Sequence, residues 1–341
     1  MVPYDVNDEK VLQAIRDLIF TCGGDNTTFE SDLVTQLIQN SLKLLFEGHD
    51  TGQLKLITRA MKEMRYAYRI FNRYGGMRRV SIFGSARTPE DHPDYLAAKA
   101  FSKQLAEFGW MCITGAANGI MKAGLEGAER DAGFGLSIKL PFESIANSAI
   151  EGDPKLITFR YFFTRKLMFM SHSDAVAAFP GGFGTMDELF EVLTLMQTGR
   201  APILPVVLLE GLPGTYWKDW QEYVNKQLLE KGWISPEDKA FYYIAKSIDD
   251  GVEHIQNFYR TYHSSRYVKE NLVIRLHHPL TPQQLDKLND QFAILLASGR
   301  IEACNPYPEE NDHLELPRIT FQHNRMHLGK LRILIDQINA F

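Results

Sequence analysis

The stretch from Asp174 to Glu188 constrains the fold of this chain more than any other. An apolar run, DAVAAF, leads into Pro180 and three glycines, and a helical pattern, DELFEVLTLMQ, follows directly. That order is typical of a strand, a tight turn and a helix. Glycines let backbone N–H groups approach an anion closely, and the start of a helix carries a partial positive charge. The stretch therefore predicts a phosphate or carboxylate site at the end of a strand.

Glu188 lies one turn into this predicted helix, and two interpretations of it are open. Thr185 to Glu188 (TMDE) fits the capping box, in which the glutamate bonds back to the helix start. Alternatively, the carboxylate does chemistry on a bound phosphorylated substrate, since a helix start does not need three glycines. The run is not a dinucleotide fingerprint, because the third glycine would fall at Asp187, and no Walker loop is present, because Leu331 follows Gly329-Lys330.

Short apolar strands and amphipathic helices alternate between residues 79 and 209. The predicted strands are Arg79–Phe83, Trp110–Thr114, Gly135–Leu140, Asp174–Phe179 and Ile203–Leu209, and the predicted helices are Tyr95–Phe108, Ile120–Ala132, Phe159–Ser171 and Thr185–Thr198. This order predicts an α/β fold with a Rossmann-like, doubly wound parallel sheet. Ligands bind beyond the carboxyl ends of such strands, so the turns at 84–85, 115–119 and 181–185 are expected to converge on one crevice.

The chain divides into three predicted regions. Residues 1–75 form a helical N-terminal region, 76–265 the Rossmann-like nucleotide-binding domain, and 266–341 a small C-terminal α/β module. The periodicity predicts N-terminal helices at Asp8–Phe20, Ser31–Phe46 and Gln53–Arg73, C-terminal strands at Asn271–Leu276, Ile301–Cys304 and Ile319–His323, and C-terminal helices at Pro282–Ala297 and Leu328–Ile338.

The composition of the chain limits the classes of partner that we expect it to bind. The net charge of -5 provides no basic field for a nucleic-acid polymer. Cys22, Cys112 and Cys304 are too far apart in the sequence for a metal-ligand spacing or a disulfide framework. The start, MVPYDVNDEK, lacks the features of a signal peptide, and no apolar run is long enough to span a bilayer. We expect a reduced, soluble, cytoplasmic protein that binds neither membranes nor nucleic-acid polymers.

A basic pair, Arg165-Lys166, lies within the aromatic and Met-rich stretch Phe159–Met170. The apolar residues suit a core or a subunit interface. Cations flanked by so much apolar surface need a partner, either a phosphate, sugar hydroxyls or a carboxylate such as Glu188.

Arg165-Lys166 followed by PGGFGTMDE, with GSAR and TGAANGIM earlier, resembles the LOG (Lonely Guy) family of nucleotide phosphoribohydrolases, often labelled lysine decarboxylases. The resemblance covers residues 79–209. It implies cleavage of the N-glycosidic bond of nucleoside 5′-monophosphates to free base and ribose 5-phosphate, without a metal or organic cofactor. The N- and C-terminal extensions are similar to those of the larger bacterial type, and the family implies a homodimer or higher homo-oligomer.

The resemblance also implies roles for individual residues. Arg165 and Glu188 match the catalytic pair, and the residues that match the substrate and phosphate site are Gly181, Gly182, Gly184, Thr185, Ser85, Gly119, Met121 and Lys166. Thr164 and Phe169 depart from the plant-type members, which have Glu and Met there. We therefore expect AMP-like purine nucleotides as substrates first, and cytokinin riboside monophosphates second.

Two other functions compete with this hydrolase. A non-catalytic nucleotide carrier or sensor would use the same crevice, but a carboxylate beside a phosphate disfavours simple binding, because like charges repel. A lysine decarboxylase would need a pyridoxal phosphate cofactor on a Schiff-base lysine. Lys166 is the only lysine near the turn, and it stands beside an arginine.

Overall fold

The computed structural model describes residues 5–140 and 146–341, which form two compact units, one ending at Tyr66 and one comprising Ala67–Phe341. The first unit contains α1 (Glu9–Thr21), α2 (Phe29–Lys43) and most of α3 (Thr51–Phe71). Asp8 and Thr28 cap the first two helices by accepting backbone N–H groups. These helices confirm the predicted N-terminal pattern. None of the helices in the described residues combines the length and apolar character needed to cross a membrane.

The second unit is built on a seven-stranded parallel sheet in the order β4-β3-β2-β1-β5-β6-β7. Its strands are β1 (Arg79–Phe83), β2 (Met111–Thr114), β3 (Gly133–Ile138), β4 (Leu156–Phe159), β5 (Ala175–Ala178), β6 (Val206–Leu208) and β7 (Tyr243–Ile244). The predicted doubly wound parallel α/β fold is confirmed.

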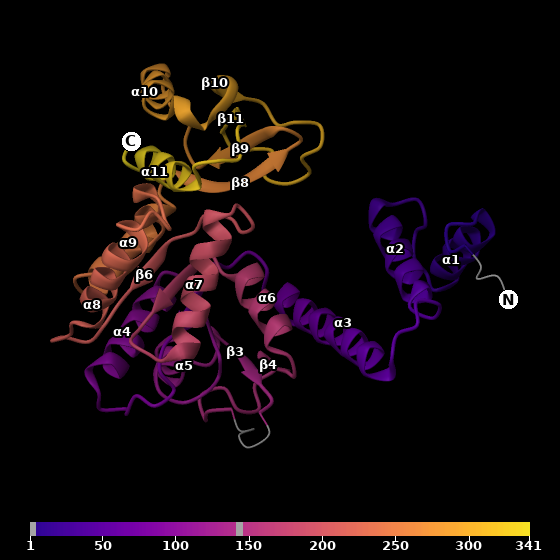
Figure 1. Cartoon of the computed structure of the whole chain (residues 1–341), viewed down its shortest axis with the longest axis horizontal. Coiled ribbons are helices and arrows are strands. Elements are labelled where there is room, and N and C mark those ends of the chain that lie inside the picture. Colours follow the sequence, from indigo (N-terminus) through magenta and orange to yellow (C-terminus); the bar gives the residue numbers. More distant parts are fainter. Residues whose placement is uncertain (1–4, 141–145) are drawn as a thin grey trace. The chain divides into compact units, whose positions relative to one another are not determined.

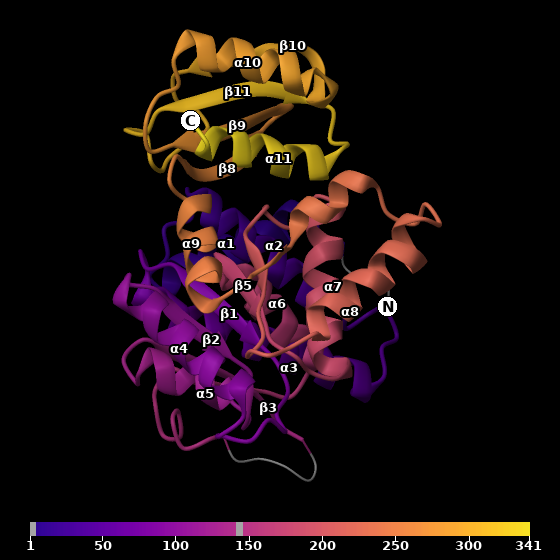
Figure 2. The same ribbon diagram turned by 90° about the vertical axis from the view of Figure 1, so that its left-hand side faces the viewer.

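Helices cover both faces of this sheet (Figures 1 and 2). Along β1, Val80 and Ile82 point into a core shared with α4 (Pro93–Glu107), α5 (Ile120–Ala128) and α9 (Ile248–Phe258). Ser81 and Phe83 point to the opposite face, which is covered by α6 (Phe162–His172). The Ser81 hydroxyl hydrogen-bonds Ser173, just after this helix, and Phe83 packs against Phe169 within it. The helix α7 (Phe183–Gln197) also packs against β1. Side chains of β1 alternate between the two faces of the sheet, so successive residues near its carboxyl end pack against different helices.

The direction of strand addition reverses between β1 and β5. The chain adds β2, β3 and β4 on one side of β1, then returns to place β5 on its other side. A ligand site is expected at such a switch point, outside the carboxyl ends of the two strands. The turns that follow β1 and β5 carry Ser85 and Gly181.

A second, antiparallel sheet of four strands in the order β10-β11-β9-β8 follows. Its strands are β8 (Tyr262–Val268), β9 (Asn271–Leu276), β10 (Leu296–Cys304) and β11 (Arg318–His323), and its helices are α10 (Pro282–Phe292) and α11 (Leu328–Asn339). Leu272, Ile274 and Leu276 of β9 point into the core that these helices close. The small α/β module of the C-terminal region is thus present, and the boundaries drawn at 75/76 and 265/266 stay predictions.

Several predicted elements are wrong in extent. The helix predicted at Phe159–Ser171 starts later, at Phe162, because Phe159 ends β4, a strand that was not predicted. The helix predicted at Pro282–Ala297 ends at Phe292, before a short 3-10 turn. The polar strand β8 was not predicted. Between residues 210 and 261, α8 (Tyr216–Tyr223), a π-helical turn, a 3-10 turn, β7 and α9 were also not predicted. These segments are short or lack a clear apolar period, so neighbours in space decide their structure.

Candidate functional site

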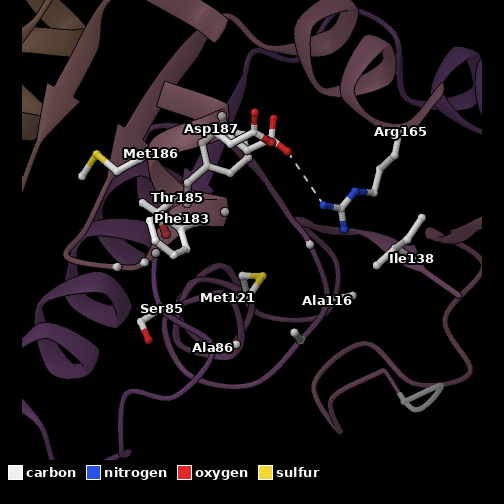
Figure 3. A pocket seen from close by; sticks show the side chains of 18 of the residues that line it. Ser85, Ala86, Ala116, Met121, Ile138, Arg165, Phe183, Thr185, Met186 and Asp187 are labelled. Carbon is white, nitrogen blue, oxygen red and sulfur yellow. Dashed lines mark ion pairs between the residues drawn. The ribbon is translucent and has the colours of Figure 1, made fainter. Parts of the chain in front are cut away.

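A pocket of about 900 Å³ lies beyond the carboxyl ends of β1, β2, β3 and β5 (Figure 3). It is lined by Phe83, Gly84, Ser85, Ala86, Arg87, Gly115, Ala116, Ala117, Met121, Ser137, Ile138, Leu140, Phe162, Arg165, Phe169, Gly181, Gly182, Phe183, Gly184, Thr185, Met186, Asp187 and Glu188. The three small-residue turns predicted to share one crevice therefore do so.

Two helices bring opposite charges to this pocket. Arg165 comes from α6 and Glu188 from α7, and their side chains face each other with Nη2 and Oε1 3.8 Å apart (Figure 3). The Arg165 guanidinium lies 5.2 Å from the ring centre of Phe162 and 5.7 Å from that of Phe169. Its buried Nε has no hydrogen-bond partner within the described part of the chain. Arg165 thus has donor capacity left for a bound molecule.

Glu188 is a buried acid whose charge is only partly offset. Just 7% of its surface is exposed, and burial raises the pKa of its carboxyl, although Lys166 and Arg165 oppose this effect. A carboxylate with a raised pKa is a better proton acceptor than an ordinary one. Glu188 is therefore a buried carboxylate in the pocket lining, paired with two cations.

Lys166 lies behind the pocket and is not among the residues that line it. Its Nζ lies 2.6 Å from Glu191, 3.0 Å from Asp187 and 3.3 Å from Glu188. Burial acts to lower the pKa of Lys166, but these carboxylates raise it above the ordinary value. The lysine therefore stays charged and holds the α7 carboxylates together, whereas its predicted contact with substrate stays a prediction.

The turns after β5 and β1 touch each other. Ser85 N donates to the Pro180 carbonyl at 3.1 Å, and a Cβ added to Gly181 would lie 2.9 Å from Ser85 N and 2.1 Å from Thr185 Oγ1. No other residue than glycine fits at position 181 without displacing one of these groups.

The start of α7 is open to an anion. The helix begins at Phe183 with Gly182 as its N-cap, and no side chain caps it. Thr185 is therefore the third residue of the helix, so the capping-box interpretation of Thr185 and Glu188 is wrong. An added Cβ at Gly182 or Gly184 would meet nothing within 4 Å. The first turn of α7 thus has no side-chain cap and has room beside its glycines, at the end of the helix that carries partial positive charge.

Gly119 supports the site from outside the pocket, whereas Met121 lines it. Gly119 has a positive φ of 61°, and an added Cβ would lie 2.2 Å from the Ser85 carbonyl oxygen. Gly115 makes room for Met121, whose Sδ would lie 2.7 Å from a Cβ there. Glycines at these turns therefore set the shape of the pocket.

Of the two residues that differ from the plant-type members, Thr164 and Phe169, only one lines the pocket. Phe169 is buried, lines the pocket and packs edge-on against Phe83 with ring centres 5.0 Å apart. Thr164 is buried but does not line the pocket, and its hydroxyl donates to the Tyr161 carbonyl at 3.0 Å. Phe169 alone of the two is placed to contact a base. The predicted oligomer interface on Phe159–Met170 stays a prediction.

Tyr216 is a site residue that the sequence did not indicate. From α8, its hydroxyl donates to the Gly181 carbonyl at 2.5 Å. The backbone N–H of Tyr216 in turn donates to Glu210, and its ring packs edge-on against Trp217. Tyr216 therefore holds the glycine turn without lining the pocket itself. No motif links two residues that are 35 positions apart, so only the fold reveals this contact.

Tyr216→Phe is expected to lower the free energy of unfolding by about 0.5–1.5 kcal/mol, the value of one hydrogen bond, and to raise KM for a phosphorylated ligand severalfold. Denaturant unfolding and steady-state kinetics measure the two effects. Tyr223→Phe, in the exposed last position of α8, is the matched control and should match the wild type in both. An unchanged KM for Tyr216→Phe would mean that the turn does not depend on this tyrosine.

Comparisons with known proteins find similarity over part of this chain. Residues 113–255 match the family model described as "Possible lysine decarboxylase". A cytokinin riboside 5′-monophosphate phosphoribohydrolase of Arabidopsis thaliana (LOG1) is 36% identical over 96 residues, which are 28% of this chain and 42% of that relative. The enzyme of the same name from Rhodococcoides fascians is 27% identical over 162 residues, 47% of this chain and 80% of that relative. The chain thus spans less than half the length of the Arabidopsis relative.

Solved structures also resemble the chain over about half of its length. The molybdenum cofactor binding protein of Rippkaea orientalis covers 53% of this chain and 97% of its own, at 22% identity and a TM-score of 0.39. The Moco carrier protein of Chlamydomonas reinhardtii covers 53% and 96%, at 20% identity and a TM-score of 0.37. Scores this low do not establish a common function. The matched family model and these phosphoribohydrolases are thus what the chain is similar to over part of its length.

Proposed function

We propose that this protein hydrolyses the N-glycosidic bond of nucleoside 5′-monophosphates, releasing the free base and ribose 5-phosphate. The observation that carries the proposal is the placement of Glu188 and Arg165 in one pocket with the uncapped, glycine-rich start of α7. A phosphate bound at the helix start would bring the sugar of a nucleotide beside a buried carboxylate. The names of the relatives give the same reaction class.

The reaction needs a nucleophile and stabilisation of positive charge. Loss of the base leaves an oxocarbenium-like sugar, as in the hydrolysis of glycosides. Glu188 accepts a proton from a water molecule while the water oxygen forms a bond to C1′, and its negative charge offsets the charge that develops on the sugar. The C1′–N bond breaks, its electron pair leaves with the base, and the base takes up a proton from solvent. One water is consumed, and the proton on Glu188 returns to solvent.

Arg165 and the glycine turn supply binding and orientation. Arg165 faces Glu188 in the pocket, and its guanidinium is the group that would donate to a ribose or phosphate oxygen. The N–H groups at the start of α7 hold the phosphate by charge-assisted hydrogen bonds. Binding energy from the phosphate, which does not react, thereby positions C1′ for attack.

Lys166 argues against a decarboxylase. A lysine that forms a Schiff base has to lose its proton, and burial or a neighbouring cation normally promotes that loss. Here three carboxylates within 3.3 Å of Nζ keep the proton on Lys166. The lysine therefore serves as a counter-ion for the acid cluster.

The proposal is tested by incubating the protein with AMP, GMP, CMP, UMP and isopentenyladenosine monophosphate, with the matching nucleosides in parallel. Release of base is followed by chromatography. We expect release from monophosphates and little or none from nucleosides, with AMP ahead of the cytokinin nucleotide because Phe169, which lines the pocket, stands where the plant-type members have Met. Nucleotide binding without any release of base would instead favour a carrier or sensor.

A further inference from the structure

The turn after β1 carries an arginine that the proposed reaction has not yet used. Arg87 is exposed, and it lines the pocket two residues beyond Ser85. Its backbone N–H donates to Ser85 Oγ at 3.1 Å, and the Ser85 carbonyl accepts from Ile120 N at 3.0 Å. Gly119 packs against the same turn, as its close approach to Ser85 shows. The backbone of Arg87 is therefore held in a fixed place.

This turn adjoins the expected phosphate position. Ser85 N is bonded to the Pro180 carbonyl, and the Cα of Gly181 approaches Ser85 so closely that no Cβ fits between them. The turn that carries Arg87 and the turn that leads into α7 therefore form adjacent parts of one wall. A ligand at the start of α7 lies beside both.

The charged side chains that line the pocket show which cation is available to bind an anionic ligand. Four charged side chains line the pocket, namely Arg87, Arg165, Asp187 and Glu188. Arg165 faces Glu188, and Lys166, which does not line the pocket, binds both lining carboxylates, Asp187 and Glu188. Arg87 has no carboxylate partner within residues 5–140 and 146–341. It is thus the one lining cation in these residues whose charge is not already offset by an acid.

We propose that Arg87 binds the phosphate of the nucleotide and sets the preference for monophosphates over nucleosides. The inference rests on the proposed function, because it names the group that recognises its substrate. A phosphate dianion beside Asp187 and Glu188 is opposed by two negative charges, and the helix start supplies only about half a unit of positive charge. A full guanidinium charge on the adjacent turn offsets that repulsion, and its planar fork fits two phosphate oxygens. Arg165 is left to act at the sugar end of the pocket.

The test compares Arg87→Met with Arg87→Lys and with Arg73→Met. Arg73 is an exposed arginine away from the pocket, so its loss changes the net charge equally. For Arg87→Met we expect KM for AMP to rise about tenfold to a hundredfold, the effect of losing a hydrogen bond to a charged group. We expect kcat to change less than threefold and any slow release of base from adenosine to stay as in the wild type. Arg87→Lys should recover part of the loss.

Binding of ribose 5-phosphate, measured by calorimetry, gives a readout that needs no turnover. Its Kd should rise by a similar factor in Arg87→Met and stay unchanged in Arg73→Met. If wild type releases no base but ribose 5-phosphate binds and Arg87→Met weakens it, the proposed hydrolysis fails and the role of Arg87 stands. An unchanged KM and Kd in Arg87→Met, or equal losses in Arg73→Met, would overturn the role of Arg87 even where hydrolysis is observed.

Discussion

Glu188→Gln is expected to lower kcat for base release about 10²–10⁴-fold, the usual effect of removing a general base, while KM changes little. Glutamine has nearly the same shape and can still pack between α6 and α7, but it accepts no proton from water and carries no charge to offset the oxocarbenium-like sugar. The proton acceptor and the negative charge both act in the transition state, so their loss should lower kcat and leave KM almost unchanged. Single-turnover base release with AMP measures it, and retention of more than a tenth of the wild-type rate would rule out Glu188 as the base.

A matched control lies one turn further along α7. Glu191 also binds Lys166, at 2.6 Å, but its side chain is about a third exposed and does not line the pocket. Glu191→Gln removes an equivalent charge from the same lysine, and its rate should stay within tenfold of the wild type. Equal losses in both variants would mean that the acid cluster, and not Glu188 alone, is required.

The stability of Glu188→Gln separates loss of chemistry from loss of fold. Burial raises the pKa of Glu188 in the folded state, so its ionised form lowers stability at pH values above that folded pKa. Below the ordinary pKa the carboxyl is protonated in both folded and unfolded chains, and the effect disappears. The variant should therefore be at least as stable as wild type at pH 7, with the difference shrinking on acidification. Thermal unfolding at pH 4 and pH 7 checks this sign.

Gly181→Ala is expected to abolish most activity by displacing the turn that holds the phosphate. The new methyl group would lie 2.1 Å from Thr185 Oγ1 and 2.9 Å from Ser85 N, and the second of these is backbone that cannot rotate away. Either the start of α7 or the turn after β1 has to shift. A displacement near 1 Å in a positioning element can lower the rate about 10²-fold, and overpacking lowers the free energy of unfolding by about 1–3 kcal/mol. Steady-state kinetics and thermal unfolding measure the two.

Gly182→Ala provides the steric comparison. An added Cβ at Gly182 meets nothing within 4 Å, and the residue has a negative φ of -92°. The Gly182→Ala variant should therefore unfold at the same temperature as the wild type, whereas Gly181→Ala should unfold at a lower temperature. If both variants were equally stable and Gly181→Ala kept its activity, the two turns would not be in contact in solution.

The sequence was most informative where one short segment determines both structure and chemistry. The apolar strand, the glycines and the helix around Phe179–Glu188 predicted β5, its turn and α7, because each of these elements is decided by residues next to it. The same reasoning placed three turns in one crevice. It could not decide whether Glu188 caps the helix or faces the pocket, because that depends on a one-turn difference in where α7 begins.

Contacts across long stretches of sequence were not predictable. Tyr216 reaches Gly181 only after β6 and α8 are in place, and the charge balance that singles out Arg87 depends on where Lys166 lies. The strand β8 has a polar sequence, YHSSRYV, without the alternation that marks a half-buried strand, and its pairing with β9 determines its structure. Such features follow from tertiary packing, which overrides local preference.

The contact between the turns at Ser85 and Gly181 has a consequence for turnover. Because hydrogen bonds and glycine packing hold both turns before any ligand arrives, the phosphate site is preorganised and little conformational entropy is lost on binding. The phosphate does not change during the proposed reaction, so the nucleotide and ribose 5-phosphate are bound by the same groups. This uniform binding captures dilute substrate but retains the sugar phosphate after the bond is broken. Product release, and inhibition by that product, would then limit the enzyme more than cleavage itself.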